Sequence, residues 1–276
     1  FCNIKTYGNR VDDMIVREKS AMKIAFGENP KNCYKEKGVY SRMSVAAKLR
    51  EVLQKTIIYD KKLREAGCET SWNGINRGSG EEQVDISKMP AYDAKLEAML
   101  PVIRGEIPLK AHAHRADDIC TAIRIAKEFH LGLRLDHVTD GALIAEELGA
   151  EHFLVAVGPS FGHATKYELK NKGFETPAIL ADAGCAVSII TDSPVIEERY
   201  LALCAGRAIY NGMREFDALR AITIQAARHI GAEDRVGSIE EGKDADFVLL
   251  KGAPFSVDAR ILYTIINGEI VYQSGE

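Results

Sequence analysis

The amino-acid sequence predicts an α/β protein built on a parallel β-sheet. Short apolar runs alternate with longer segments whose apolar residues recur at helical spacing, most clearly between residues 107 and 210. Strands and helices that alternate at this pitch form βαβ units, in which the strands are parallel. Periodicity alone leaves open whether the sheet is open or closed. No GxGxxG or P-loop pattern follows a predicted strand, which disfavours a doubly wound nucleotide-binding fold.

The predicted elements follow one another in a regular order. Predicted strands span residues 22–26, 107–113, 133–137, 153–157 and 185–191, and predicted helices span 42–66, 92–105, 117–129, 141–148, 177–183, 196–210 and 215–230. A polar, glycine-containing loop is expected over residues 71–88. After Gly231 the composition changes to turn residues between short β runs at 247–250, 261–266 and 269–272, the last two joined by an Asn-Gly hairpin turn. We therefore predict a domain over residues 1–230 and a small β segment over 231–276.

Composition and charge exclude several classes of partner. A formal net charge of −4 and the absence of interleaved basic and aromatic residues argue against a nucleic-acid partner. No apolar run approaches the roughly 20 residues of a membrane span, so no membrane association is expected. The six cysteines occur singly, without a CxxC pair, and predict reduced thiols in a cytoplasmic protein.

Polar residues cluster at the predicted carboxyl ends of three strands, where barrel active sites are assembled. The clusters lie at residues 110–118, 135–137 and 190–194. Alternation along a strand sends His112 and His114 to the same side, and imidazole nitrogens with a carboxylate oxygen are a ligand set that suits Zn²⁺. A carboxylate such as Asp192 can take a proton from a metal-activated water and return it to a leaving amine.

A structural interpretation stands beside each of these assignments. An isolated histidine is more often a hydrogen-bonded core or surface residue than a ligand, and only the coincidence of three clusters favours a metal site. His130, His152 and His229 lie in or beside predicted helices and are interpreted as structural. For His163, in the loop after the strand at 153–157, substrate contact and solvent exposure remain open.

These motifs together resemble one superfamily. His112-Ala113-His114, the lone His137, Thr191-Asp192-Ser193-Pro194 and the tail from Gly237 to Phe247 (GSIEEGKDADF) resemble the amidohydrolase superfamily, and within it the imidazolonepropionase-related amidohydrolases. The resemblance implies a TIM-type (β/α)₈ barrel over residues 1–230, partial because its first strands are missing, with a small C-terminal β-sandwich appendage over 231–276. It also implies a metal-dependent hydrolase.

The resemblance assigns ligands to a divalent metal, with zinc expected as one or two ions. It makes His112 and His137 metal ligands, and Asp192 both a ligand and the proton-transferring carboxylate. Lys23 falls where binuclear relatives carry a carboxylated lysine that bridges two metals. The alternative for Lys23 is an ordinary barrel lysine in an ion pair.

The resemblance also predicts residues around a small-molecule substrate. His114 and Arg115 would line the pocket, and His163 and Tyr7 are further candidates for substrate contact. Arg115 is able to hold a carboxylate through a bidentate pair. The alternative for Arg115 is an ion pair with Asp117 or Asp118.

One departure from the family concerns the start of the chain. Relatives open with a His-x-His motif on the first barrel strand, and no such motif precedes Tyr7. We therefore expect the first barrel strands and their ligands to lie upstream of Phe1.

The leading functional hypothesis is hydrolysis of a C–N bond in a small amide, cyclic amide or dipeptide-like substrate. A deaminase acting on a small heterocycle and a catalytically inactive binding barrel are the alternatives. The sequence does not give the substrate, the identity or number of the metals, or whether the chain forms a homo-oligomer.

Overall fold

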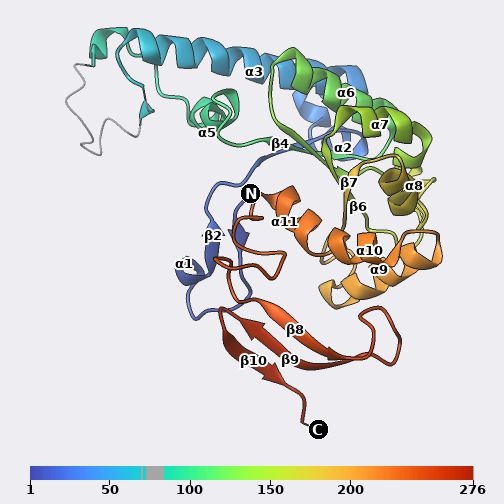
Figure 1. Cartoon of the computed structure of the whole chain (residues 1–276). Coiled ribbons are helices and arrows are strands. Elements are labelled where there is room, and N and C mark those ends of the chain that lie inside the picture. Colours follow the sequence, from blue (N-terminus) through green and yellow to red (C-terminus); the bar gives the residue numbers. More distant parts are fainter. Residues whose placement is uncertain (70, 73–83, 276) are drawn as a thin grey trace.

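The computed structural model describes residues 1–69, 71–72 and 84–275, and its centre is a five-stranded parallel sheet (Figure 1). Neighbouring strands in the sheet are also successive strands in the chain, which is the usual arrangement of consecutive strands. The strands are β3 (Met22–Ala25), β4 (Leu109–Ala113), β5 (Leu133–His137), β6 (Leu154–Val157) and β7 (Ala186–Ile189). The predicted parallel sheet is therefore confirmed, with each strand within about two residues of its expected limits.

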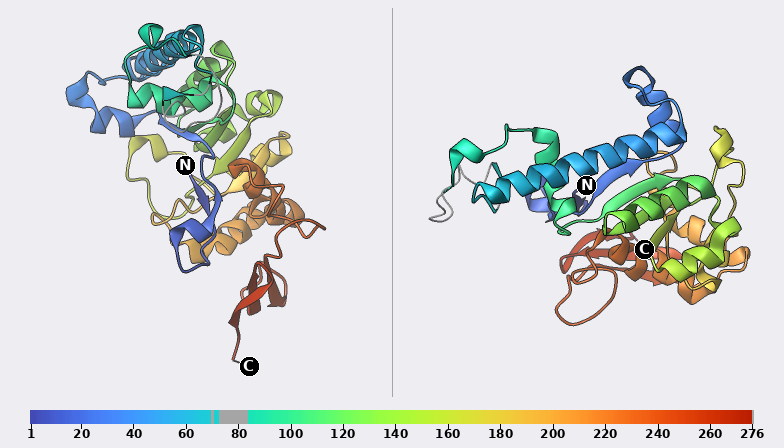
Figure 2. Two further views of the ribbon diagram at one scale, coloured as in Figure 1. Left: turned by 90° about the vertical axis from the view of Figure 1, so that its left-hand side faces the viewer. Right: turned by 90° about the horizontal axis from the view of Figure 1, so that it is seen from above.

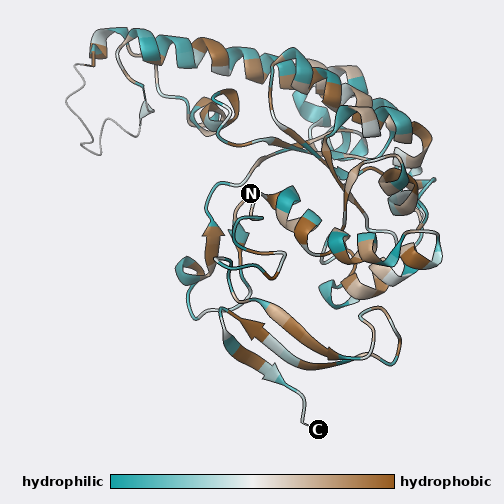
Figure 3. Cartoon of the chain, viewed as in Figure 1, coloured by the Kyte–Doolittle hydropathy of each residue, from teal (hydrophilic) through white to brown (hydrophobic). Residues whose placement is uncertain are grey.

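Helices lie on both sides of this sheet in Figure 1. On one side are α3 (Arg42–Glu65), α6 (Ala116–Glu128) and α7 (Ala145–Glu151), and on the other are α9 (Leu201–Tyr210), α10 (Glu215–Ala221) and α11 (Ile224–Ile230). The remaining helices are α2 (Glu28–Cys33), α5 (Ala94–Ile103) and α8 (Thr176–Asp182). Figure 3 shows α3 and α6 as alternating hydrophilic and hydrophobic segments, which is the pattern of helices with one buried face.

The core forms where the apolar side chains of the strands meet those of the helices. Leu135 of β5 and Ile119 of α6 are fully buried members of one continuous cluster. Burying a side chain of this size contributes about 1.5–3 kcal/mol. Local signals fix the helix ends: the Ser41 hydroxyl accepts the Ser44 N–H at the start of α3 and forms a capping box.

Three predicted helices differ from the structure in detail. The helix expected over 215–230 is two helices, because Thr223 has non-helical angles (φ −127°, ψ −102°). The helix expected over 141–148 begins as a 3-10 turn (Gly141–Ile144) before α7, and the one expected over 196–210 becomes α-helical only at Leu201. The loop expected over residues 71–88 falls mostly outside the described residues, apart from a 3-10 turn at Ile86–Lys88.

The C-terminal segment forms a separate antiparallel sheet, as expected for a small β appendage (Figure 2). Its strands are β8 (Phe247–Lys251), β9 (Arg260–Ile266) and β10 (Glu269–Gln273). The hairpin between the last two has positive φ at Asn267 (54°) and Gly268 (80°), the geometry that makes Asn-Gly the preferred pair.

The amino-terminal segment packs against this appendage. It contains β1 (Asn3–Ile4), α1 (Val11–Met14) and β2 (Ile15–Arg17), with β1 and β2 paired antiparallel. Lys5 Nζ forms ion pairs with Asp244 Oδ2 at 2.7 Å and Asp246 Oδ2 at 2.8 Å. These ion pairs therefore link the amino-terminal segment to the C-terminal appendage.

In the part of the chain that is described, no helix combines the length and apolar character needed to cross a membrane.

We expect Leu135→Ala to lower the free energy of unfolding by about 2–5 kcal/mol, because it opens a cavity against the central strand. Leu143→Ala is the matched control, since Leu143 is 66% exposed and Leu135 is 0% exposed. The control should change stability by less than about 0.5 kcal/mol. Urea unfolding measures both, and equal effects would contradict the position of β5 in the core.

Candidate metal centre

Three histidines meet at the carboxyl ends of β4 and β5. His112, His114 and His137 are all buried, and one ring nitrogen from each lies within 4.8 Å of the others. Their ring centroids are 4.3–4.8 Å apart. Within the described residues, this is the one group of His, Cys, Asp or Glu side chains close enough together to hold a metal ion.

Strand geometry explains two of the three positions. Alternation along β4 sends His112 and His114 to the same side, as predicted, and the register pairs His112 with Asp136. The same register pairs His137 with Ala113, so alternation alone would send His137 to the opposite face. Positive φ angles at His137 (78°) and Val138 (46°) turn the chain at the end of β5, and the His137 ring comes to 4.3 Å from that of His112.

This turn is held by hydrogen bonds from the neighbouring strand. The Val138 N–H donates to the Ala113 carbonyl at 3.0 Å, and the Asp140 N–H donates to the His114 carbonyl at 2.8 Å. Left-handed backbone at a β-branched residue costs on the order of 1–3 kcal/mol and persists only where surrounding structure imposes it. The strain therefore lies at Val138, directly after the histidine whose ring is turned into the site.

Each ring has one nitrogen engaged by a neighbour. The His137 Nδ1–H donates to the Gly158 carbonyl at 2.7 Å, His114 Nδ1 shares a hydrogen bond with the Thr139 hydroxyl at 2.8 Å, and His112 Nε2 accepts from the Asn29 amide at 3.1 Å. Partners of this kind fix the orientation of metal-binding imidazoles. In His114 and His137 they leave Nε2 for a metal ion. In uncharged His112 the nitrogen with the free lone pair is Nε2 itself, so a metal ion there would take the place of the Asn29 amide.

Burial favours the uncharged form of two of the imidazoles, those of His112 and His114. Burial first, and then the neighbouring His137 and His114 rings, lowers the pKa of His112 to about 2. The pKa of His114 is lowered to about 3 by burial, then by His137 and Lys166. Neutral imidazole is the form that binds a metal ion. The donor set therefore fits a divalent cation that prefers nitrogen ligands, such as Zn²⁺.

A buried carboxylate that the sequence did not reveal lies beside this cluster. Glu168, in a 3-10 turn at Tyr167–Leu169, is 1% exposed, and its Oε1 has no hydrogen-bond partner among the described residues. Oε1 lies 4.0 Å from His114 Nε2. Burial raises the pKa of Glu168 above its usual range. Periodicity could not identify this residue, because it lies in the polar loop between β6 and α8.

Two of the predicted metal-binding residues lie outside the histidine group. Asp192 is exposed in the loop after β7, with φ 52°, and Lys23 is exposed on the edge strand β3. Lys23 Nζ lies 5.7 Å from the centroid of the Phe1 ring, and its charge contributes to the lowered pKa of His112. The roles assigned to Asp192 and Lys23 remain predictions.

The predicted substrate contacts also have other partners. Arg115 donates to both oxygens of Asp117, at 3.0 and 3.2 Å, which is the ion pair that the sequence left as an alternative. His163 is exposed, and the Tyr7 hydroxyl donates to the Glu269 carboxylate of β10. His229 is buried and hydrogen-bonds Asp136 at 2.8 Å, consistent with a structural role.

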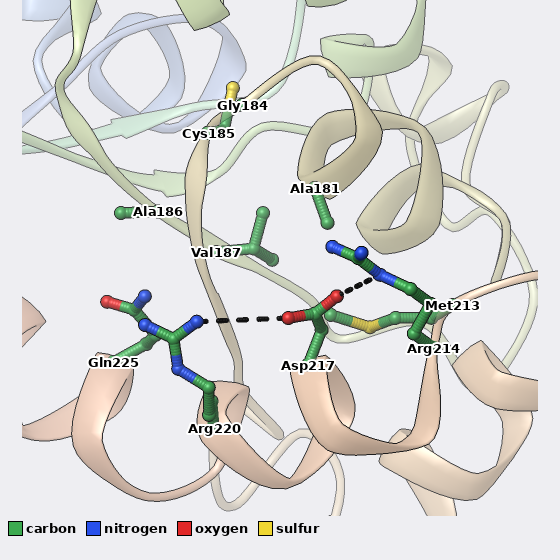
Figure 4. Close-up of a pocket in the computed structure, with 10 residues that line it drawn as sticks. All are labelled: Ala181, Gly184, Cys185, Ala186, Val187, Met213, Arg214, Asp217, Arg220 and Gln225. Atoms are coloured by element: carbon green, nitrogen blue, oxygen red, sulfur yellow. Dashed lines mark hydrogen bonds and ion pairs between the residues drawn. The ribbon is translucent and has the colours of Figure 1, made fainter.

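Two cavities near β7 differ from each other in position and in chemistry. A cavity of about 230 Å³ at the amino end of β7 contains Asp217 between Arg214 and Arg220 (Figure 4). The amino ends of barrel strands contribute to stability rather than to catalysis. A more apolar cavity of about 410 Å³ is formed by the loops after β6 and β7 together with the start of α9. It is lined by Phe161, Pro194, Val195, Ile196, Tyr200 and Leu203 with Glu197. It lies at the same end of the sheet as the histidines.

Comparison with known proteins agrees with this combination of parallel strands and histidines at their carboxyl ends. The Amidohydrolase family model matches residues 79–271, and the chain belongs to this family. A solved amidohydrolase from Thermotoga maritima superposes with a TM-score of 0.86 and 36% identity, covering 98% of this chain and 67% of that one. The fold is therefore of the TIM-barrel type found in this family.

Curated relatives include imidazolonepropionases, to which the chain is related. The enzyme from Bacteroides thetaiotaomicron is 27% identical over 230 residues, covering 71% of this chain and 53% of its own length. The amidohydrolase tasK of Hapsidospora irregularis is 24% identical over 260 residues, covering 90% of this chain and 25% of its own length. The chain thus spans about half or less of these two relatives.

We expect His137→Ala to weaken Zn²⁺ binding by at least on the order of 100-fold, exceeding the roughly 10- to 100-fold that loss of an outer partner costs. His163→Ala is the control, because His163 is exposed and outside the group. Competition with a chromophoric chelator measures both affinities. Equal Zn²⁺ affinities of the two variants would show that His137 is not a metal ligand.

A second prediction concerns the glycine that accepts the His137 hydrogen bond. A Cβ at Gly158 (φ 140°) would lie 2.0 Å from the Ile190 carbonyl oxygen, whereas one at Gly184 (φ 88°) would meet nothing within 4 Å. Gly158→Ala should therefore destabilise the protein by at least about 2 kcal/mol more than Gly184→Ala. Urea unfolding tests the difference, and equal losses would contradict the close approach at Gly158.

Proposed function

We propose that the protein to which this chain belongs is a metal-dependent hydrolase that cleaves a C–N bond in a small amide, cyclic amide or dipeptide-like substrate. The observation that carries the proposal is the meeting of three buried imidazoles at the carboxyl ends of two parallel strands. Membership of the amidohydrolase family supports it.

We propose zinc, as one or two ions, with His112, His114 and His137 as ligands. When bound there, such an ion polarises a substrate carbonyl and lowers the pKa of a water molecule. The protein's part is to orient the His137 ring through the Gly158 carbonyl and the His114 ring through the Thr139 hydroxyl. Burial also favours the uncharged form of His112 and His114.

We assign proton transfer to Asp192. Its carboxylate would take a proton from the attacking water and deliver it to the departing nitrogen. The position of Asp192 in the loop after β7, at the same end of the sheet as the histidines, supports this assignment. Its exposure means that the carboxylate is available to solvent and substrate.

The substrate contacts proposed for Arg115 and His163 also fall in loops at this end of the sheet. Arg115 would exchange Asp117 for a substrate carboxylate, which its planar group can bind in the same bidentate way. The apolar cavity between the loops after β6 and β7 would receive a hydrophobic part of the substrate.

In the full-length protein, Asp192→Asn should reduce turnover by at least on the order of 100-fold, at the lower end of what general acid–base catalysis contributes. Zinc content should stay within about twofold of the wild type, since the imidazoles remain. Elemental analysis and a screen of small amides measure the two effects. Asp182→Asn, on an exposed helix position, is the control. Undiminished turnover in Asp192→Asn would reject the proposed role.

A further inference from the structure

The carboxylate of Glu168 is the strongest unexplained feature near the histidine group. Its side chain is 1% exposed, yet its Oε1 has no hydrogen-bond partner among the described residues. A buried carboxylate costs several kcal/mol unless it is paired or binds a metal. The other oxygen, Oε2, is already satisfied by the Glu28 N–H at 2.8 Å.

The neighbouring backbone holds this carboxylate in place. Gly27 has φ 78°, and a Cβ there would lie 2.3 Å from Glu168 Oε2. Because Oε2 is backed by Gly27 and bonded to the Glu28 N–H, Oε1 is the oxygen that is left for another partner. It is also the oxygen that lies 4.0 Å from His114 Nε2.

The nearest cationic side chain does not provide a hydrogen bond to Oε1. Lys166 Nζ lies 3.8 Å away, beyond hydrogen-bond distance, and its side chain is 32% exposed. The same Nζ donates a hydrogen bond to Oδ1 of the Asn29 side-chain amide. Asn29 in turn donates to His112 at 3.1 Å, so Lys166 is part of the support of His112.

A metal ion would satisfy both Oε1 and His114 Nε2. In a tetrahedral zinc site, an imidazole nitrogen and a carboxylate oxygen bound to the same ion are roughly 3.3–3.5 Å apart. The 4.0 Å between Oε1 and His114 Nε2 is somewhat longer, so these two atoms must approach each other on metal binding. Glu168 Oε1 is not part of the group whose atoms lie within 4.8 Å of one another, so the carboxylate must move toward His112 and His137 on metal binding.

We propose that Glu168 is a carboxylate ligand of the histidine metal centre, binding through Oε1. It supplies a negative charge that the three imidazoles lack, from a position buried beside them. This inference rests on the proposed metal centre and adds to it a ligand from the loop after β6.

Glu168→Gln tests the inference with Co²⁺ and Zn²⁺ as the probes. The variant keeps the shape of the side chain and removes its charge. We expect Zn²⁺ affinity, measured by chelator competition on the full-length protein, to fall on the order of 100-fold or more. The visible absorption spectrum of the Co²⁺-loaded protein should also change, because it reports the ligands bound to the ion.

Two further variants make the test independent of folding losses. Asp118→Asn is the control, because Asp118 is also buried but pairs with Arg42 at 3.0 Å. Asp118→Asn should keep the wild-type Co²⁺ spectrum and affinity. Glu168→Asp keeps the charge but withdraws the oxygens by one methylene, so it should alter the Co²⁺ spectrum and lose less affinity than Glu168→Gln.

The outcomes separate this inference from the proposed metal centre. If the wild type binds no metal, the metal centre itself is wrong. If the wild type binds metal and both Glu168 variants keep its Co²⁺ spectrum, the metal centre stands and Glu168 is not a ligand, whatever the change in affinity.

Discussion

The site depends on the backbone turn at His137 and Val138. Without positive φ at these residues, strand alternation would direct the His137 ring away from His112 and His114. Val138 is fully buried, and Gly141 leaves space for it, since a Cβ at Gly141 would lie 2.7 Å from Val138 Cγ1. Packing and hydrogen bonds from β4 therefore hold a conformation that an isolated chain would rarely adopt.

Burial gives the same site its chemistry. The sheet and its helices remove the imidazoles from water, which favours the uncharged form of His112 and His114. Neighbouring amide, hydroxyl and carbonyl groups each engage one ring nitrogen. Beside these nitrogen donors lies a buried carboxylate oxygen that has no hydrogen-bond partner among the described residues. Nitrogen donors and such an oxygen together are groups that a divalent cation can bind.

Much of the fold was accessible from the sequence, because apolar periodicity reports burial directly. The five parallel strands and the approach of His112 to His114 follow from periods of 3.6 and 2. The break at Thr223 did not, since apolar residues continue at helical spacing across it. Strand alternation also could not predict the turn at His137. This histidine was singled out by the resemblance to amidohydrolases and not by geometry.

Glu168 was missed because nothing in a polar loop distinguishes a buried carboxylate from a solvated one. Only tertiary structure shows that its Oε1 faces His114.

The central claim is that the three imidazoles form a metal centre. The anomalous scattering of zinc in crystals of the full-length protein tests this claim most directly. We predict a zinc peak within roughly 2.0–2.1 Å of a ring nitrogen of both His112 and His137. A zinc peak elsewhere, or none in zinc-soaked crystals, would contradict the account.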